Sequence, residues 1–600
     1  MKRPTAGLTT LLFLLFLTLS NAHAVGPARA PTSPTLGNPT LLADYVFTPD
    51  PAYAYSLTGT EVLPGATVYT LLMDSLTWRS DEEVDRTLWT HEVVVIVPDE
   101  VRANTGFLLI NGGSNPEDPV DEEILLLVLP IATSTGTVVS IVSEIPNQPL
   151  KFPDQEAAID EDTLVAYSWD KAMVTGEAAW AAYFPMTKAA VRALDTVQDF
   201  TSTQLDGIAV DEFVVTGFSK RGATAWLTAA VDPRVRAVAP GVFDVLDVPL
   251  QIERHFGAYG FYSSAIEDYE NFEIVRRVRS PEGEFLASIV DPLAYRDTLT
   301  VPKLLLNSTG DQFFLPDSAN FYLDQLPGET LVRQFPNTDH GLGGVEFELV
   351  GDLLGWYGDI LAERPRPALQ WTELRPGVVT LASEPLPKRV TLWQATNSTA
   401  RDFRLEVLGE QWTSSAVTAL EDGTYRVRVP TPEMGYTGFL LAVDYDREGI
   451  GDQTYTTPVF VAPQSLPFDV VDPIGTPRGV LYWACQAAGA SACDNVDFTP
   501  DELEALLPVS VFGEYISDLA SLSEVLLTLS EDPAVKARRA CAATRLNIAA
   551  GELGWYSSLE LGLLGGGPLW RFYGRAEEAF ETGASARADR LCDRINRSTE

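Results

Sequence analysis

Long apolar runs are almost absent from this sequence. After residue 24 no stretch reaches about 18 consecutive apolar residues, the length that a membrane-spanning helix needs, so no integral membrane span is expected. The one apolar segment, Leu8–Leu19, follows two basic residues and ends at a small-residue cleavage site, Ala22-His23-Ala24. This pattern predicts a secretory signal peptide over residues 1–24. We therefore expect export to the periplasm or the extracellular space after cleavage near Ala24.

Cysteine is scarce and confined to the C-terminal end of the chain. The four cysteines are Cys485, Cys493, Cys541 and Cys592. An even number of clustered cysteines in an exported chain predicts two disulfides in a C-terminal module, and their pairing stays open. A zinc site is the alternative, but the cysteines lack the C-x-x-C spacing and no histidine lies near them.

Basic residues are few, with 42 Lys and Arg against 83 Asp and Glu, and the formal net charge is −41. Such an acidic chain is a poor partner for nucleic acid and for anionic membrane surfaces. The sequence also lacks a phosphate-binding GxxxxGK[ST] loop, an HExxH motif and an EF-hand loop. No cofactor or metal is therefore expected, and the partner should be a small-molecule or peptide substrate.

Alternating strand and helix patterns follow a flexible Pro- and Thr-rich leader over residues 25–42. They predict an α/β-hydrolase fold over residues 43–365, with a mostly parallel sheet covered by helices on both faces. An aromatic-rich helical insertion, at about residues 245–300, is either a cap that faces the substrate or a pair of packed surface helices. Residues 318–326 are expected to form a helix.

Beyond residue 365 the pattern changes. Short alternating strands separated by Pro, Gly and Asn/Asp turns predict a small β-sandwich over residues 366–467. Residues 468–600 contain the cysteines and several helical stretches, so they are expected to form a helical, disulfide-containing module.

The stretch Glu212–Gly222 has the composition of a buried strand, a tight turn and the start of a helix. A serine at such a turn, here Ser219, is lifted clear of the sheet and faces backbone N–H groups that can hold an oxyanion. Gly217 and Gly222 supply the small residues that the turn needs. The match to G-x-S-x-G is imperfect, because Arg221 stands where the last glycine belongs. An ordinary strand–loop–helix is the alternative.

The scarcity of histidine narrows the choice of a general base for Ser219. After the predicted signal peptide only His91, His255 and His340 remain, and only His340 follows the last expected strand of the sheet. Asp311 directly follows a strand ending in Ser-Thr-Gly. Ser219, Asp311 and His340 have the chain order of an α/β-hydrolase triad. Asp244 and Asp339 are the alternative acids, although Asp339 is adjacent to His340 and would orient it poorly.

The expected oxyanion donors are the backbone N–H of Lys220 and one N–H of the Gly112–Gly113 loop. This loop follows the strand from Thr105 and resembles the HGGG type, although an ordinary glycine turn is the alternative. The side chains of Lys220 and Arg221 are unusual beside a nucleophile. They either attract an anionic substrate or, in the interpretation we favour for Arg221, pair with one of the many acidic side chains.

Six motifs resemble the PhoPQ-activated pathogenicity-related proteins, over about residues 43–468. This resemblance implies an α/β-hydrolase followed by a β-sandwich, and it makes Lys-Arg before the glycine a family trait. Members are linked to virulence regulation and antimicrobial-peptide resistance, a secreted growth-repressing signal is similar, and no substrate follows from the resemblance. The motifs are Gly217–Gly222, Ala258–Tyr269, Asp291–Arg296, Gly310–Asp317, Pro336–His340 and Leu392–Asn397.

Two functions are compatible with these observations. The first is an exported serine hydrolase that cleaves an ester or a peptide bond through an acyl-enzyme on Ser219. The alternative is a secreted signalling or binding protein that keeps the hydrolase fold without turnover. The complete set of Ser219, Asp311 and His340 favours the hydrolase.

Overall fold

The computed structural model describes residues 40–115, 122–205, 207–447, 451–472, 477–489, 497–561 and 566–598. The predicted signal peptide and most of the predicted leader lie outside these ranges, as does Cys493.

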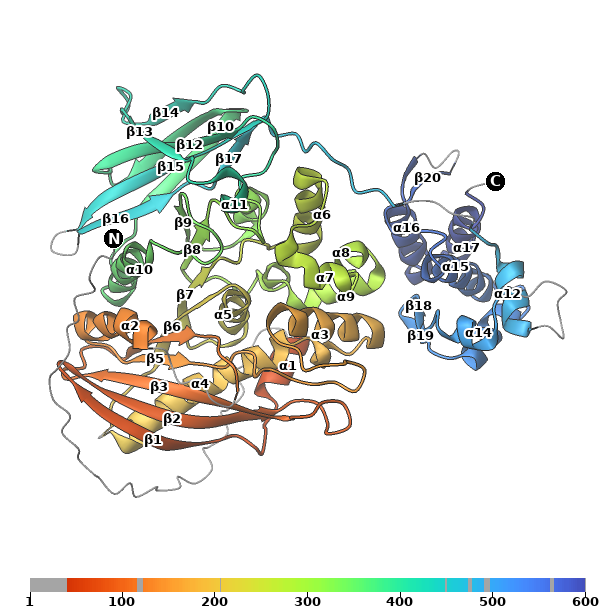
Figure 1. The fold of residues 1–600 in the computed structure, drawn as a ribbon, viewed down its shortest axis with the longest axis horizontal. Helices are drawn as coiled ribbons and strands as arrows, with labels where there is room; N and C mark the ends of the chain where they lie inside the picture. The colour runs from red at the N-terminus through yellow and green to blue at the C-terminus, as the bar shows by residue number, and fades with distance from the viewer. Residues whose placement is uncertain are drawn as a thin grey trace, which may run out of the picture.

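A large twisted sheet forms the centre of the molecule (Figure 1). The pairs β1–β2, β2–β3 and β3–β5 are antiparallel, and the pairs from β5 through β4, β6, β7 and β8 to β9 are parallel. In space the order is β1-β2-β3-β5-β4-β6-β7-β8-β9. The strands are β1 (Ala54–Leu63), β2 (Ala66–Thr77), β3 (Leu88–Pro98), β4 (Thr105–Ile110), β5 (Val139–Val142), β6 (Glu212–Phe218), β7 (Val235–Gly241), β8 (Lys303–Ser308) and β9 (Thr330–Phe335).

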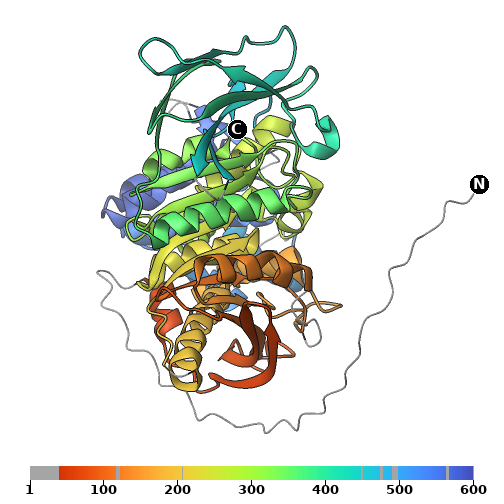
Figure 2. The ribbon, with the colours of Figure 1, turned by 90° about the vertical axis from the view of Figure 1, so that its left-hand side faces the viewer.

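Helices cover both faces of this sheet because its parallel strands carry apolar side chains on both sides. Val214 packs in one core with α2 and α10, whereas the adjacent Val215 packs in the opposite core with α4 and α5. Figure 2 shows α2 and α10 crossing one face together. The helices are α1 (Leu41–Phe47), α2 (Glu122–Thr135), α3 (Glu161–Thr175), η1 (Ala178–Trp180), α4 (Tyr183–Gln204), α5 (Lys220–Val231) and α10 (Glu346–Leu361).

The expected insertion between β7 and β8 is helical. The segment expected as a helix over residues 318–326 forms two short 3₁₀ helices instead of one α-helix. The elements are α6 (Val248–Tyr259), η2 (Ser264–Ile266), α7 (Glu267–Asn271), α8 (Ile274–Arg277), α9 (Pro281–Val290), η3 (Pro292–Tyr295), η4 (Ser318–Phe321) and η5 (Leu323–Gln325).

The strands after residue 367 form two layers, and one of them continues the central sheet. Thr456 of β16 pairs with Val332 of β9, so the sheet runs on through β16, β15, β12 and β13. A three-stranded sheet, β10-β11-β14, packs its apolar side chains into the same core. The elements are β10 (Ala368–Arg375), β11 (Val378–Glu384), β12 (Arg389–Asn397), α11 (Leu405–Leu408), β13 (Thr413–Val417), β14 (Tyr425–Arg428), β15 (Tyr436–Arg447), β16 (Gly451–Thr456) and β17 (Phe460–Ala462).

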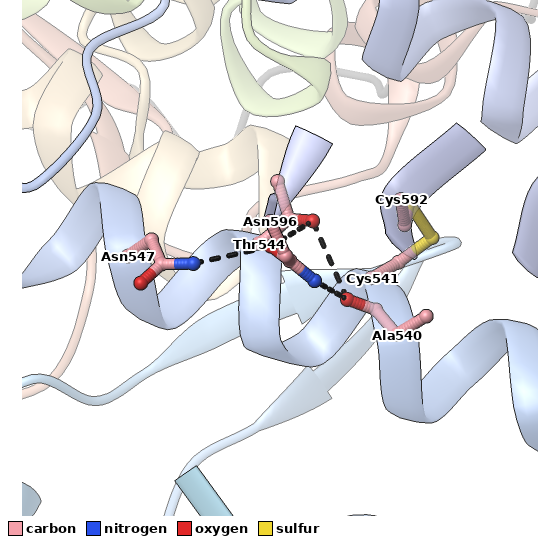
Figure 3. The surroundings of a disulfide bond; sticks show 6 residues. All are labelled: Ala540, Cys541, Thr544, Asn547, Cys592 and Asn596. Atoms are coloured by element: carbon pink, nitrogen blue, oxygen red, sulfur yellow. Dashed lines mark hydrogen bonds between the residues drawn. A yellow bond between two sulfur atoms is a disulfide. The ribbon is translucent and has the colours of Figure 1, made fainter. Parts of the chain in front are cut away.

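A C-terminal helical module has its own apolar core and lies beside the insertion (Figure 1). Cys541 of α15 and Cys592 of α17 form a disulfide (Figure 3), and Cys485 is also disulfide-bonded. Arg545 pairs with Glu282 of α9 at 2.6 Å, which ties the module to the insertion. The elements are α12 (Val480–Ala488), α13 (Pro500–Glu504), β18 (Val509–Val511), β19 (Glu514–Ile516), α14 (Leu519–Leu527), α15 (Pro533–Ala549), β20 (Ser558–Glu560), β21 (Gly566–Pro568), α16 (Leu569–Glu581) and α17 (Ser585–Ile595).

The spatial order of the strands reverses at β4 and β5, because β5 lies between β3 and β4. This reversal determines where a ligand site is expected. The parallel part of the sheet begins at β4; the chain adds β5 on one side of β4 and then crosses to β6 on the other side. Ligands of open α/β sheets bind at the carboxyl ends of the strands where the order reverses in this way. The prediction of an α/β-hydrolase fold is confirmed. None of the helices in the described ranges has the length and apolar character that crossing a bilayer requires.

Candidate active site

Ser219 lies in a strained turn between β6 and α5. Its backbone has φ 57° and ψ −128°, in a region that residues other than glycine rarely adopt. The neighbouring glycines allow the turn: a Cβ on Gly217 would lie 2.4 Å from the carbonyl oxygen of Arg221, and one on Gly222 would lie 2.8 Å from that of Gly241. The predicted tight turn is therefore present, and it holds the serine hydroxyl above the end of the sheet.

The structure brings together the three residues that chain order selects. The Nε2 atom of His340 lies 2.8 Å from Ser219 Oγ, and its Nδ1 atom lies 2.8 Å from Asp311 Oδ2. Asp311 follows β8 and His340 lies in the loop after β9, so all three come from the carboxyl ends of parallel strands. This arrangement allows His340 to accept the serine proton while Asp311 fixes the ring.

Residues 312–314 fix the positions of both Asp311 and His340 through hydrogen bonds and ring packing. The backbone N–H groups of Phe313 and Phe314 donate to Asp311 Oδ1 at 2.7 and 3.2 Å. The N–H of His340 donates to Gln312 Oε1 at 3.0 Å, and the Phe313 ring lies 4.3 Å from the imidazole, centroid to centroid. The loop after β8 therefore positions the carboxylate and the imidazole together.

The two other histidines of the described chain are buried and lie outside this hydrogen-bonded series. His91 contacts Ser75 Oγ and the carbonyl oxygen of Ser143, both at 2.9 Å, and burial lowers its pKa to about 4. His255 lies on α6, and burial, reinforced by the charge of Arg404, lowers its pKa to about 3. Both imidazoles are neutral at pH 7, and within the described residues it is His340 that hydrogen-bonds to Ser219 Oγ.

The alternative acids take other partners. Asp244 is buried and accepts a hydrogen bond from the hydroxyl of Tyr322, and burial raises its pKa to about 8, with the charges of Asp311 and Asp317 adding to the effect. Asp339 accepts a hydrogen bond from the backbone N–H of Gly341 at 2.9 Å. Asp311 is thus the carboxylate that contacts the imidazole.

The raised pKa of Asp244 predicts a pH-dependent cost to folding. The unfolded chain loses this proton near pH 4 and the folded chain near pH 8, so wild-type stability falls across that interval through this group. The asparagine side chain of the Asp244→Asn variant cannot ionise. The melting temperature of the variant minus that of the wild type should therefore increase from pH 4 to pH 8 and stay constant above pH 8. Thermal unfolding of both proteins at several pH values measures the difference. A gap that does not widen with pH would contradict the prediction.

Lys220 and Arg221 form an ion-pair cluster with the first residues of α3. Arg221 donates to both carboxylate oxygens of Glu161 at 2.6 and 2.8 Å and also to the carbonyl oxygen of Ile145. Lys220 Nζ lies 2.7 Å from Glu161 and 3.0 Å from Asp162. Burial works to raise the pKa of Glu161, but the hydrogen bonds and charges of Arg221 and Lys220 outweigh it and lower the pKa. The structure thus gives Arg221 an acidic partner, as we favoured.

Glu161 supports the expected oxyanion region indirectly. Gly112 follows β4, whose last residue, Ile110, pairs with Gly217, so the glycine loop begins beside the serine turn. A Cβ on Gly112 would lie 2.8 Å from the Arg221 guanidinium, which Glu161 holds in place. Gly113 has φ 121°, which favours glycine. On the other side of Ser219, α5 begins at Lys220, and the first N–H groups of a helix lack intrahelical acceptors.

Two cavities meet at Ser219. The aromatic cavity, of about 60 Å³, includes Trp169, Tyr183, Tyr269, Phe313 and Phe314 in its wall. The aliphatic cavity, of about 450 Å³, lies between the sheet and helices α2 and α10, with Leu127, Val128, Leu349 and Leu353 in its wall and Gly112 beside the serine. Ser219 thus lines two separate cavities, one with an aromatic wall and one with an aliphatic wall.

The insertion contributes to the wall of the aromatic cavity through Ile252, His255 and Tyr269. This is the position expected of a cap that faces the substrate. Sequence reasoning missed Glu161, because one acid among so many carries no distinguishing local signal. It also missed the aliphatic cavity, which depends on the packing of helices far apart in the chain.

Within the described residues, no three His, Cys, Asp or Glu side chains are grouped to hold a metal ion.

A family model for the PhoPQ-activated pathogenicity-related protein matches residues 42–404.

Among curated proteins, the chain is similar to autocrine proliferation repressor protein A of Dictyostelium discoideum, with 33% identity over 455 residues that span 72% of this chain and 92% of that protein. Among solved structures, it resembles an acetyl xylan esterase from Paenibacillus sp. R4, at 15% identity and TM-score 0.39, over 55% of this chain and 97% of the esterase. It also resembles an S-formylglutathione hydrolase from Agrobacterium tumefaciens, at 15% identity and TM-score 0.34, over 51% of this chain and 99% of the hydrolase.

Proposed function

We propose, from the premise that the chain belongs to the PhoPQ-activated pathogenicity-related protein family, that it is a serine hydrolase that cleaves an ester or peptide bond. The observation that carries this proposal is the continuous hydrogen-bonded series from Ser219 Oγ through His340 to Asp311, with separations of 2.8 Å at both links. The strained backbone of Ser219 at the carboxyl end of β6 supports the same function.

In the proposed mechanism, Ser219 Oγ adds to the substrate carbonyl carbon as His340 Nε2 accepts the serine proton. Asp311 holds the proton on Nδ1 and stabilises the imidazolium. The backbone N–H of Lys220 and one N–H of the Gly112–Gly113 loop donate to the oxyanion. His340 then protonates the leaving group, and water attacks the acyl-enzyme by the same proton transfers in reverse.

Covalent labelling with a fluorophosphonate probe tests this proposal. The mature, disulfide-intact protein is expected to label, and Ser219→Ala and His340→Ala are expected not to label, because the probe reacts with an activated serine. Asp339→Asn is the matched control: it lies beside His340 but can still accept the Gly341 N–H, so it should label like the wild type. A folded wild-type protein that does not label would overturn the proposal.

A second candidate is a secreted signalling protein that does not depend on turnover. It is favoured by the similarity to a protein named autocrine proliferation repressor protein A. Ser219→Ala separates the two functions. If the wild-type protein represses growth and the folded variant does so equally well, signalling does not need the serine, whereas loss of repression would join signalling to hydrolysis.

Export and the C-terminal disulfides belong to the same proposal. We propose that the chain is secreted after cleavage near Ala24. The Cys541–Cys592 disulfide supports exposure to an oxidising compartment, where such bonds persist.

A further inference from the structure

The aliphatic cavity is unusual in its composition and in its position. From Ser219 and Gly112 it extends between α2 and α10, where its wall consists of Leu, Ile and Val side chains. Its charged residues, Glu161 and Arg221, are paired with each other through two hydrogen bonds. The part of the cavity away from Ser219 therefore offers apolar contact and no unpaired charge, which suits a hydrocarbon chain.

The two cavities differ in volume, so they can hold substituents of different size on the substrate carbonyl carbon. A cavity of about 150 Å³ lined by apolar side chains holds benzene. The aliphatic cavity, at about 450 Å³, exceeds this value threefold, whereas the aromatic cavity, at about 60 Å³, falls below it. Of these two cavities, the one between α2 and α10 has room for a long substituent.

His340 indicates which substituent leaves. The leaving group must lie on the side from which His340 Nε2 can protonate it. The imidazole packs against the rings of Phe313 and Phe314, at 4.3 and 5.8 Å between centroids, and both rings belong to the wall of the aromatic cavity. The leaving group thus belongs on the aromatic side, and the acyl group belongs on the aliphatic side.

We propose that the substrate is an ester with an unbranched, medium-length aliphatic acyl chain, which lies between α2 and α10 during acylation of Ser219. This inference rests on the proposed serine-hydrolase function. The ester carbonyl carbon forms a bond to Ser219 Oγ, and its bond to the alcohol oxygen breaks as that oxygen takes the proton from His340. Water then cleaves the acyl-serine bond, which releases the fatty acid and restores the serine proton.

A series of methyl esters tests the length of the acyl chain, because a methanol leaving group is small enough for the aromatic cavity. For the mature full-length protein, kcat/KM should rise from acetate through butyrate to octanoate, by up to about fourfold for each methylene that the cavity buries. A preference for acetate, or for a phenylacetyl ester over octanoate, would overturn the inference.

Two substitutions that fill the cavity test its location. Leu127 of α2 and Leu349 of α10 are half-buried in its wall, so Leu127→Trp and Leu349→Trp should reduce the space with little damage to folding. Each substitution is expected to lower kcat/KM for the octanoate ester at least tenfold. The value of kcat/KM for the acetate ester should change less than about twofold. Phe347→Trp is the matched control, because Phe347 is 86% exposed on the same helix. Equal losses for acetate and octanoate would overturn the inference.

Labelling of the same samples separates the inference from the function on which it rests. If the fluorophosphonate probe labels Ser219 but the chain-length series is flat, the serine hydrolase stands and the acyl-chain site is overturned. If the folded wild type does not label, both fall together. A binding readout without turnover adds a further test: octanoate should raise the melting temperature of Ser219→Ala but not that of Ser219→Ala/Leu349→Trp.

Discussion

Asp311→Asn is expected to lower kcat by about 10⁴-fold, with substrate binding and folding unchanged. The two oxygens of Asp311 contact His340 Nδ1 at 2.8 and 3.0 Å, so the carboxylate keeps a proton on Nδ1 and leaves Nε2 free to accept one from Ser219. An asparagine amide can donate to Nδ1 and thereby select the wrong tautomer, and this change costs about 10⁴ in other Ser-His-Asp enzymes. Steady-state kinetics with an ester that the wild type cleaves measures the loss.

The alternative acids provide the controls for this substitution. Asp339→Asn keeps an acceptor for the Gly341 N–H and is expected to retain wild-type kcat. Asp244 is already protonated at pH 7, since burial raises its pKa to about 8, so Asp244→Asn should be far less harmful than Asp311→Asn. A 10⁴-fold loss in Asp244→Asn with near-normal activity in Asp311→Asn would assign the acid to Asp244 and contradict the prediction.

Removing the Cys541–Cys592 disulfide is expected to destabilise the C-terminal module by about 4 kcal/mol. The bond closes a loop with a sequence separation of 51, and the loss of that constraint raises the chain entropy of the unfolded module. Hydrogen exchange of the full-length Cys541→Ala/Cys592→Ala variant measures the effect. For amides of α15 and α17 that exchange by unfolding of the module, about 4 kcal/mol corresponds to exchange about 10³-fold faster.

The effect should be confined to the module. The amides of β6 and α5 belong to the separate core of the central sheet, so they should exchange as in the wild type, and labelling of Ser219 should persist. The hydrogen bonds of Asn596 with Ala540, Thr544 and Asn547 keep α15 and α17 in contact in the variant, which gives it a folded state to measure (Figure 3). Unchanged exchange in α15 and α17 would show that these contacts hold the helices without the disulfide.

Much of the candidate site could be predicted from the sequence because its signals are local. The strand, glycines and helix start around Ser219 are adjacent in the chain, so the turn is visible in the local sequence although Gly222 also packs against Gly241. The scarcity of histidine left His340 as the base that follows the last strand. Chain order then selected Asp311, and the motifs of the family were visible before any contact was known.

What the sequence by itself determined was the α/β-hydrolase fold, the family and the identity of three residues to bring together. Only the tertiary structure decided how they are supported: the pairing of Glu161 with Arg221, the continuation of the sheet from β9 into β16, and the cavity between α2 and α10. Each of these depends on contacts between residues far apart in the chain. Periodicity and spacing report only on neighbours, so such contacts become visible only when the chain is folded.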